Sequence, residues 1–259
     1  MQCQTESDKS EPKHGDTVEC SRCGGRATFK LLDIGIYRPG KPLKTIHCKA
    51  CDAAQEKARA DRRAEKHAEY LDKAKIAAGI EGPLQQRTLE GFKAKGAAQT
   101  AAKTAATNFS KSEGAIWLAF CGPTGTGKSH LATAIANCAI EGGEKSVCYA
   151  KMISMMRRFR ATFHRDCRET EESVARYYRK VKLLILDEFG IRKELSEWER
   201  MTLDDILDYR WEQQKRTLII SNMTAKEMIT AAGERIASRF AELGAVVNFT
   251  WSDYRKGKH

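Results

Sequence analysis

The chain has 259 residues, enough for one mid-sized domain and a smaller one. No apolar run approaches the ~20 residues of a membrane span, and Met1–Ser7 lacks the apolar core of a secretory signal, so we expect a cytoplasmic protein without a membrane segment. The formal net charge of +11 favours a polyanionic partner, although a bound nucleotide would also tolerate a positive surface.

Residues 1–51 predict a small zinc ribbon. Two Cys-x-x-Cys pairs, separated by 24 residues, can each supply two thiolates to a tetrahedral Zn²⁺. The four proposed ligands are Cys20, Cys23, Cys48 and Cys51. Between the pairs we expect a hairpin with strands at 27–32 and 43–46, and His47 is an alternative ligand. A metal would stabilise a segment too short for its own core, whereas a redox role is disfavoured because no βαβ pattern surrounds the cysteines.

Residues 52–84 predict a charged helical segment. From 52 to 78 the chain is rich in Ala, Glu, Lys and Arg and has no Gly or Pro, which indicates a mostly exposed helix. This helix is either a solvated spacer or a docking element for a partner. The following stretch, 79–112, predicts a linker with short helical pieces, in which Leu89 and Phe92 pack near a nucleotide base or against the core.

Residues 85–259 predict an α/β domain. The expected strands are 115–121, 146–150, 182–187, 216–221 and 245–250, with helices between them. Such alternation is typical of a parallel sheet with helices on both faces.

The segment Gly122–Ser129 matches the phosphate-loop pattern G-x-x-x-x-G-K-[ST]. It follows an apolar strand and precedes a helical stretch, which is the context this motif requires. The glycines let backbone N–H groups approach phosphate oxygens, Lys128 can reach the β- and γ-phosphates, and the Ser129 hydroxyl can ligate Mg²⁺. The sequence therefore predicts a site for a magnesium-bound nucleoside triphosphate.

Residues 157–168 hold five arginines and two phenylalanines with one acid. Basic groups can follow a phosphate backbone while aromatic rings stack on bases, so we expect single-stranded DNA to contact this segment. The alternative is that the phenylalanines belong to the core and the arginines to the solvent. The candidate contact residues are Arg157, Arg160 and Phe163, and the family resemblance described below is what implies single-stranded DNA contact for Arg160 and Phe163.

Polar residues end two of the predicted strands. Asp187 and Glu188 follow the apolar run 183–186, and Asn222 follows 217–221. Ligands gather at the carboxyl ends of parallel strands. Asp187 is therefore placed to hold Mg²⁺, and Glu188 to polarise an attacking water. Asn222 either meets the γ-phosphate or the water, or caps the next helix in competition with Thr224.

Two arginines, Arg235 and Arg239, lie four positions apart and so on one face of a predicted helix. Such a pair suits the γ-phosphate of a neighbouring subunit, as an arginine finger given in trans. An exposed basic face is the alternative.

Taken together, these residues resemble the helicase-loader branch of the AAA+ ATPases, the DnaC/DnaI-like proteins and their transposition relative IstB. The resemblance covers about residues 85–259 and extends to the aromatic string Asn248–Arg255. It implies a P-loop AAA+ sheet without a helical lid, here preceded by the zinc ribbon and the charged helix. The zinc ribbon departs from DnaC itself and is closer in kind to DnaI-like and phage loaders.

The resemblance also implies roles for individual residues. The catalytic assignments are Lys128, Asp187 for Mg²⁺, Glu188 as catalytic carboxylate, Asn222 as sensor 1 and Arg239 as the finger. The assigned nucleotide contacts are Gly122, Pro123, Thr124, Gly125, Thr126, Gly127, Lys128, Ser129, His130 and Arg235. Arg210 matches a further recurrent arginine to which we assign no role.

The function expected from this resemblance is ATP-dependent loading of a DnaB-type replicative helicase onto single-stranded DNA, by a chain that forms homo-oligomers. The expected cofactors are ATP, Mg²⁺ and Zn²⁺. An IstB-like transposition helper is the alternative, and the zinc ribbon and the tail argue against it. A small-molecule kinase is disfavoured, because Asp187, Glu188 and Asn222 suit a water nucleophile.

Overall fold

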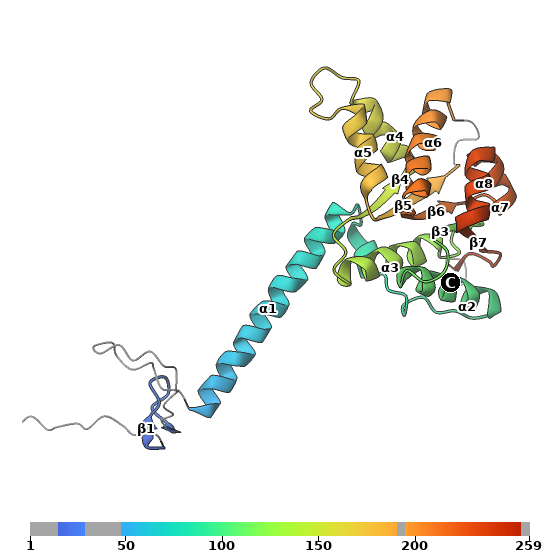
Figure 1. Ribbon diagram of the computed structural model, residues 1–259. Coiled ribbons are helices and arrows are strands. Elements are labelled where there is room, and N and C mark those ends of the chain that lie inside the picture. Colours follow the sequence, from blue (N-terminus) through green and yellow to red (C-terminus); the bar gives the residue numbers. More distant parts are fainter. Residues whose placement is uncertain (1–14, 29–47, 191–194, 255–259) are drawn as a thin grey trace, which may run out of the picture. The chain divides into compact units, whose positions relative to one another are not determined.

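The computed structural model of the chain describes residues 15–28, 48–190 and 195–254 (Figure 1). The chain divides into two units, Met1–Glu69 and Tyr70–His259. The boundaries expected after residues 51 and 84 follow changes in composition and stay predictions.

The first unit contains a short antiparallel hairpin of β1 (Thr17–Glu19) and β2 (Arg26–Thr28). The turn between them is tight because Gly24 N donates to Cys20 O at 2.9 Å, and Gly24 has a φ of 71°, which favours glycine. Residues 26–28 thus pair with 17–19, a pairing that the sequence did not predict. The rest of the predicted hairpin, 29–32 and 43–46, and the alternative ligand His47 lie outside the described residues.

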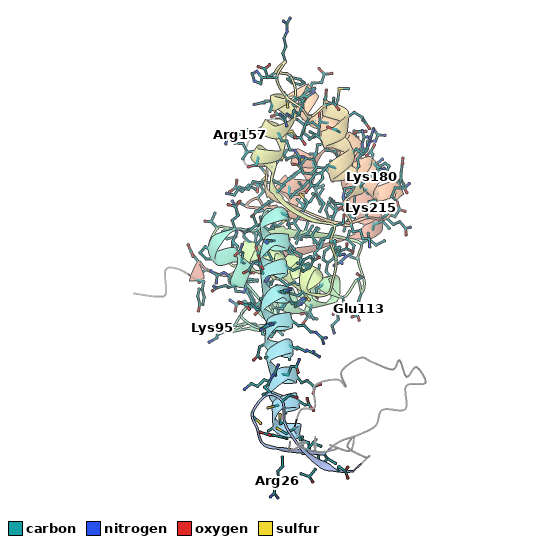
Figure 2. The ribbon with its side chains drawn as sticks, turned by 90° about the vertical axis from the view of Figure 1, so that its left-hand side faces the viewer. Arg26, Lys95, Glu113, Arg157, Lys180 and Lys215 are labelled. Atoms are coloured by element: carbon teal, nitrogen blue, oxygen red, sulfur yellow. The ribbon has the colours of Figure 1, made fainter. Side chains whose placement is uncertain are left out.

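The long helix α1 (Lys49–Ala77) begins between the last two cysteines. Most of its residues are exposed, and Figure 2 shows their side chains standing out around the helix. The predicted mostly exposed, charged helix is thereby confirmed, and its role as a spacer or a docking element stays a prediction. No helix among the described residues is both long and apolar enough to cross a lipid bilayer.

The second unit is built on a five-stranded parallel sheet, ordered β4-β5-β6-β3-β7 among the described residues. Its strands are β3 (Trp117–Cys121), β4 (Val147–Lys151), β5 (Leu183–Phe189), β6 (Arg216–Ser221) and β7 (Gly244–Asn248). These strands confirm the expected strand ranges and the parallel sheet. Strands β3, β5 and β6 are almost fully buried, which explains why they read as continuous apolar runs.

Helices cover both faces of this sheet (Figure 1). The bounds are η1 (Gly82–Gln86), α2 (Ala97–Ser110), α3 (Lys128–Glu141), α4 (Met152–Ala161), α5 (Glu171–Lys180), α6 (Glu197–Glu212), α7 (Ala225–Ala232) and α8 (Glu234–Leu243). Phe120 faces the core formed with α2 and α3, whereas Trp117 faces the core formed with α4 to α8. The expected absence of a helical lid after the last strand stays a prediction.

Helix α2 corrects the expectation of a linker with short helical pieces. It is a helix of 14 residues that packs on α3 and buries Ala102, Ala106 and Phe109. The sequence signal was weak because the buried face is made mostly of alanine, whose small side chain gives little hydrophobic contrast with its neighbours.

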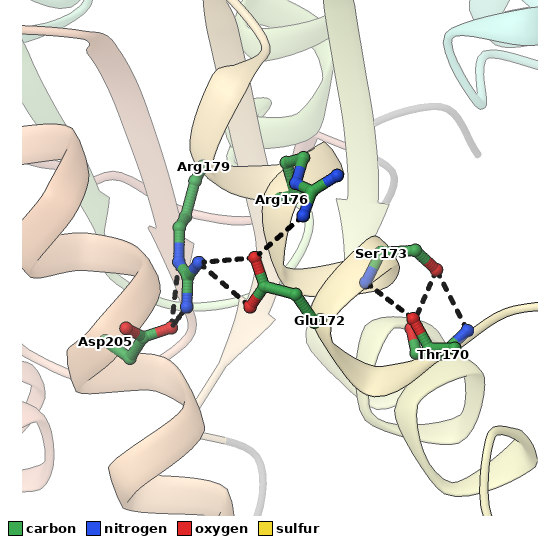
Figure 3. Close-up of polar contacts among 6 residues, drawn as sticks. All are labelled: Thr170, Glu172, Ser173, Arg176, Arg179 and Asp205. Atoms are coloured by element: carbon green, nitrogen blue, oxygen red, sulfur yellow. Dashed lines mark hydrogen bonds and ion pairs between the residues drawn. The ribbon is translucent and has the colours of Figure 1, made fainter.

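Helix α5 is fastened at both ends (Figure 3). Thr170 caps it in a reciprocal pair of hydrogen bonds with Ser173. Near its other end, Arg179 donates to Asp205 of α6, with an Nε–Oδ2 distance of 2.9 Å, and also contacts Glu172. These contacts cap the start of α5 and join its end to α6.

Candidate nucleotide site and zinc cluster

The phosphate loop joins β3 to α3 through three glycines with positive φ. Gly122, Gly125 and Gly127 have φ values of 136°, 78° and 95°, a region that other residues rarely adopt. A Cβ at Gly122 would lie 2.2 Å from the carbonyl oxygen of Phe249, and one at Gly127 would lie 2.7 Å from the Phe92 ring. The loop conformation and its close neighbours thus both require glycine.

Lys128, the first residue of α3, is folded back into this loop. Its side-chain Nζ donates to the carbonyl oxygens of Gly122 at 2.7 Å and Pro123 at 2.6 Å. Lys128 is 4% exposed, and burial lowers its pKa while the nearby Asp187 opposes the shift. The ammonium is therefore held inside the loop, where it can meet phosphate oxygens.

Asp187 is joined to the loop by Ser129, as the strand-tip argument predicts. The Ser129 hydroxyl donates to Asp187 Oδ2 at 3.1 Å, and the Tyr149 hydroxyl donates to the same oxygen. A hydroxyl and a carboxylate side by side are a fitting pair of ligands for Mg²⁺. Tyr149 was missed from the sequence, although the register pairs it with Ile185, two positions before Asp187 and so on the same face.

Glu188 is held at the end of β5 by its backbone and by a lysine. It has a φ of 61°, and its N–H donates to Asp187 Oδ1 at 2.7 Å. Lys151 Nζ donates to Glu188 Oε1 at 2.7 Å, and this contact raises the pKa of Lys151. The lysine was also missed, although the register places it directly opposite Asp187. The two carboxylates therefore lie at the end of β5, where Asp187 is bonded to Ser129 of the loop and Glu188 is bonded to Lys151.

Asn222 lies just beyond the end of β6 and is exposed. The competing role as helix cap belongs to Thr224, whose hydroxyl accepts from Glu227 N at 3.3 Å at the start of α7. Ser221 donates to Phe189 O at 2.8 Å and so ties this strand tip to β5. Asn222 lines a cavity of about 670 Å³, and its amide is not used as a cap.

Phe92 and Leu89 are buried against α2 and α3, so they belong to the core. Phe92 nevertheless lies beside the loop, because its ring meets the His130 ring edge-on at 5.8 Å. A ring nitrogen of His130 lies 3.0 Å from the carbonyl oxygen of Thr88, and burial lowers the histidine pKa. The segment before α2 thus forms one wall of the loop.

Arg235 and Arg239 both pair with one carboxylate on another helix, Asp208 of α6. Arg235 Nη2 lies 2.8 Å from Asp208 Oδ2, and Arg239 contacts the other oxygen. The Arg239 guanidinium also lies over the Trp211 ring at 4.9 Å. The Arg239 side chain is 12% exposed and that of Arg235 is 65% exposed, so the two arginines differ in their access to a neighbour.

Arg210 is fully buried and has a structural role. Its guanidinium donates to the carbonyl oxygens of Tyr178 at 2.9 Å and Val181 at 2.7 Å, and to the Thr217 hydroxyl at 2.9 Å. Burial lowers the pKa of Arg210 to about 9, so it remains charged at pH 7. It satisfies backbone carbonyls at the end of α5, a role that spacing along the sequence does not reveal.

The basic segment divides between helix, core and surface. Phe159 is fully buried, whereas Phe163 lies beyond the end of α4, is 61% exposed and meets the Trp198 ring at 5.5 Å. Arg157 is exposed, and Arg160 donates to Glu199 at 2.8 Å. The core alternative is therefore right for Phe159, and the exposed group is Arg157, Arg160 and Phe163.

A cavity of about 160 Å³ connects this basic group to the candidate catalytic carboxylate. Its lining includes Arg157 and Arg160 of α4, Glu188 at the end of β5 and Leu195 before α6. A ligand bound at α4 would thus lie beside the hydrolytic site.

The four predicted zinc ligands come together in the first unit. Their sulfur atoms all lie within 4.8 Å of one another, and the Sγ atoms of Cys23 and Cys48 are 3.7 Å apart. Thiolates around Zn²⁺ at ~2.3 Å are separated by roughly 3.8 Å, so the cluster is close to the size such an ion needs. Backbone N–H groups of Arg22 and Cys48 lower the pKa of Cys20, whereas hydrogen bonds with Cys23 and Cys48 raise the pKa of Cys51.

We expect mass spectrometry of the native chain to find about one zinc per molecule. Replacing Cys48 and Cys51 together with serine should remove the ion, because two thiolates remain. Cys138→Ser, at an exposed thiol of α3, is the matched control and should retain the metal. Zinc well below one per native chain, or equal zinc in the double variant and the control, would refute the site.

Comparisons of the sequence with protein families and with curated proteins point to related ATP-binding proteins. A sequence profile of IstB-like ATP binding proteins matches residues 49–237. The chain is 34% identical over 160 residues to the replicative helicase loader DnaC of Buchnera aphidicola subsp. Baizongia pistaciae, covering 61% of this chain and 63% of that protein. It is 34% identical over 137 residues to DnaC of Escherichia coli K12, covering 52% and 55%. The chain thus spans less than two thirds of the curated relatives it matches.

Among solved structures, the fold is similar to the crystal structure of the DnaC helicase loader. The TM-score is 0.56 at 20% identity, and the match covers 65% of this chain and 99% of that chain. The expected parallel sheet with helices on both faces is therefore confirmed as a fold.

Proposed function

The chain belongs to the family of IstB-like ATP binding proteins, and on this basis we propose that it loads a replicative ring helicase onto single-stranded DNA during replication initiation. In this proposal it binds and hydrolyses ATP to ADP and phosphate. The observation that carries the loader role is the 34% identity to curated proteins named replicative helicase loader. The same observation favours the loader over the transposition helper.

The polar groups of the nucleotide site support a role in ATP hydrolysis. MgATP supplies the phosphoanhydride that is cleaved. The loop Gly122–Ser129 would bind its phosphates, and Ser129 and Asp187, which already lie side by side, would hold Mg²⁺. Glu188 accepts a proton from the attacking water, and Asn222 orients that water. His130 and Arg235 complete the proposed nucleotide contacts.

In this proposal the active form is an oligomer, because Arg239 is supplied to the nucleotide site of a neighbouring subunit. Arg239 acts on the γ-phosphate of a neighbouring subunit, and Arg235 lies beside it. Before assembly both are held by Asp208. The cysteine cluster and the exposed helix α1 dock the helicase in this proposal.

A pull-down against the replicative helicase of the same host tests the proposed function. We expect the immobilised chain to retain the helicase with MgATP, and Lys128→Ala, which removes the phosphate-binding ammonium, to retain less. Failure to retain the helicase with MgATP, MgADP or no nucleotide would contradict the loader role while leaving ATP binding untouched.

Single-stranded DNA affinity tests the exposed basic group. Phe163→Ala should weaken binding about 5-fold or more, because stacking of one base contributes ~1–3 kcal/mol. Arg160→Ala should also weaken binding and should reduce its salt dependence by about one counterion. Arg176→Ala, at an exposed arginine paired with Glu172 on α5, is the matched control. If both variants bind like the parent across a salt series, DNA binds elsewhere.

A further inference from the structure

The segment 249–254, here called the strap, follows β7 and runs along the phosphate loop. Phe249 is fully buried, and its N–H donates to Cys121 O at 2.7 Å. Its ring lies 5.1 Å from that of Phe120 in β3 and 4.7 Å from that of Trp251. The strap is therefore anchored in the core directly beside the strand that leads into the loop.

Two hydrogen bonds join the strap to consecutive peptide units of the loop. The indole Nε1 of Trp251 donates to the carbonyl oxygen of Thr126 at 2.9 Å. The backbone N–H of Tyr254 donates to the carbonyl oxygen of Gly125 at 3.1 Å. Between these donors, Asp253 lies so close that a Cβ at Gly125 would be 1.9 Å from its carboxylate. The strap thus holds the middle of the loop from one side.

The two hydrogen bonds also fix the direction of the N–H groups that follow Gly125 and Thr126, because peptide units are planar and trans. In such a unit the carbonyl oxygen and the following N–H point in opposite directions. Because Gly125 O and Thr126 O face the strap, the N–H groups of Thr126 and Gly127 point away from it. Neither N–H donates a hydrogen bond to another described residue, so both can donate to a ligand.

We propose that the indole N–H of Trp251 and the backbone N–H of Tyr254 are positioning groups for phosphate binding. They hold two peptide units so that the N–H groups of Thr126 and Gly127 are already aimed at phosphate oxygens before the nucleotide arrives. Preorganised donors bind an anion more tightly than donors that must first be ordered. This inference rests on the proposed binding of ATP at the loop.

Trp251→Phe tests the indole contact, because phenylalanine keeps a ring against Phe249 and loses the N–H. We expect the dissociation constant of MgATP to rise about 3- to 10-fold, the effect of losing one hydrogen bond. The KM for ATP hydrolysis should rise by a similar factor with kcat unchanged. A loss of folded protein would instead lower the apparent kcat and leave KM unchanged, which would overturn the positioning role.

Trp198→Phe is the matched control. It removes an indole N–H that donates to Glu171 at 3.1 Å, between α6 and α5, and should leave ATP affinity unchanged. Equal ATP affinity in the parent and in Trp251→Phe would overturn the inference, and so would equal weakening in both tryptophan variants.

Tyr254→Pro tests the second contact, because proline has no backbone N–H. Its matched control, Tyr254→Ala, removes the ring and keeps the N–H. We expect weaker MgATP binding in Tyr254→Pro and near-parent binding in Tyr254→Ala. Equal weakening in the two variants would show that the ring matters and would overturn the backbone contact.

Calorimetry of MgATP binding gives a readout independent of hydrolysis. If the parent fails to bind MgATP, the proposed ATP function fails. If the parent binds MgATP and Trp251→Phe binds it with the same affinity, the strap inference alone fails.

Discussion

Replacing Glu188 with glutamine is expected to lower ATP turnover by about 100- to 10,000-fold, the range typical of a lost general base. ATP binding should stay near that of the parent. Glutamine has almost the same shape as glutamate but cannot accept a proton from water at neutral pH. The carboxylate stands at the tip of β5, with its backbone N–H bonded to Asp187 and its Oε1 bonded to Lys151. The contacts of the phosphate loop itself do not involve it.

Single-turnover hydrolysis and equilibrium binding of labelled ATP separate the two effects. Lys128→Ala is the contrasting variant and should lose binding, because it removes the ammonium held inside the loop. Glu172→Gln, at an exposed glutamate that pairs with arginines on α5, is the matched control and should keep full turnover (Figure 3). Turnover of Glu188→Gln within a few-fold of the parent would remove Glu188 from the catalytic role.

The strands and their polar tips were predictable because their signals are local. Strand β5 is an apolar run, and the parallel arrangement brings Asp187 to the same edge as the phosphate loop. Its contact with Ser129 therefore follows from topology, without knowledge of side-chain packing. The same logic, extended to the register of β4, would also have found Tyr149 and Lys151.

Other features depend on contacts between distant segments and left no local signal. Asp208 pairs with two arginines from another helix, and nothing in its own neighbourhood marks it as their partner. Arg210 bonds backbone carbonyls about 30 residues away, so its spacing resembles that of a functional arginine. Likewise, α2 is buried through alanines. Long-range packing decides all three cases.

Arg239→Ala is expected to lower ATP hydrolysis by about 1,000-fold or more and to leave ATP binding intact, as for a finger acting on a neighbour's γ-phosphate. In the single chain this guanidinium pairs with Asp208, lies over Trp211 and is 12% exposed. Assembly must therefore release it from Asp208. Arg235, whose side chain is 65% exposed, is the more accessible of the two, so Arg235→Ala should be measured beside it.

Mixing two inactive variants tests whether the finger acts in trans. Lys128→Ala subunits lack ATP but keep Arg239, whereas Arg239→Ala subunits keep an intact phosphate loop. Hydrolysis should therefore reappear when the two are mixed under assembly conditions, because each Arg239→Ala site can receive an arginine from its neighbour. Asp208→Asn weakens the intramolecular pair and should retain turnover. Two results together would contradict the finger: mixing restores no hydrolysis, and both Asp208→Asn and Arg239→Ala have lower turnover and a lower melting temperature than the parent. The ion pair would then stabilise the packing of α6 against α8, and the finger would lie elsewhere.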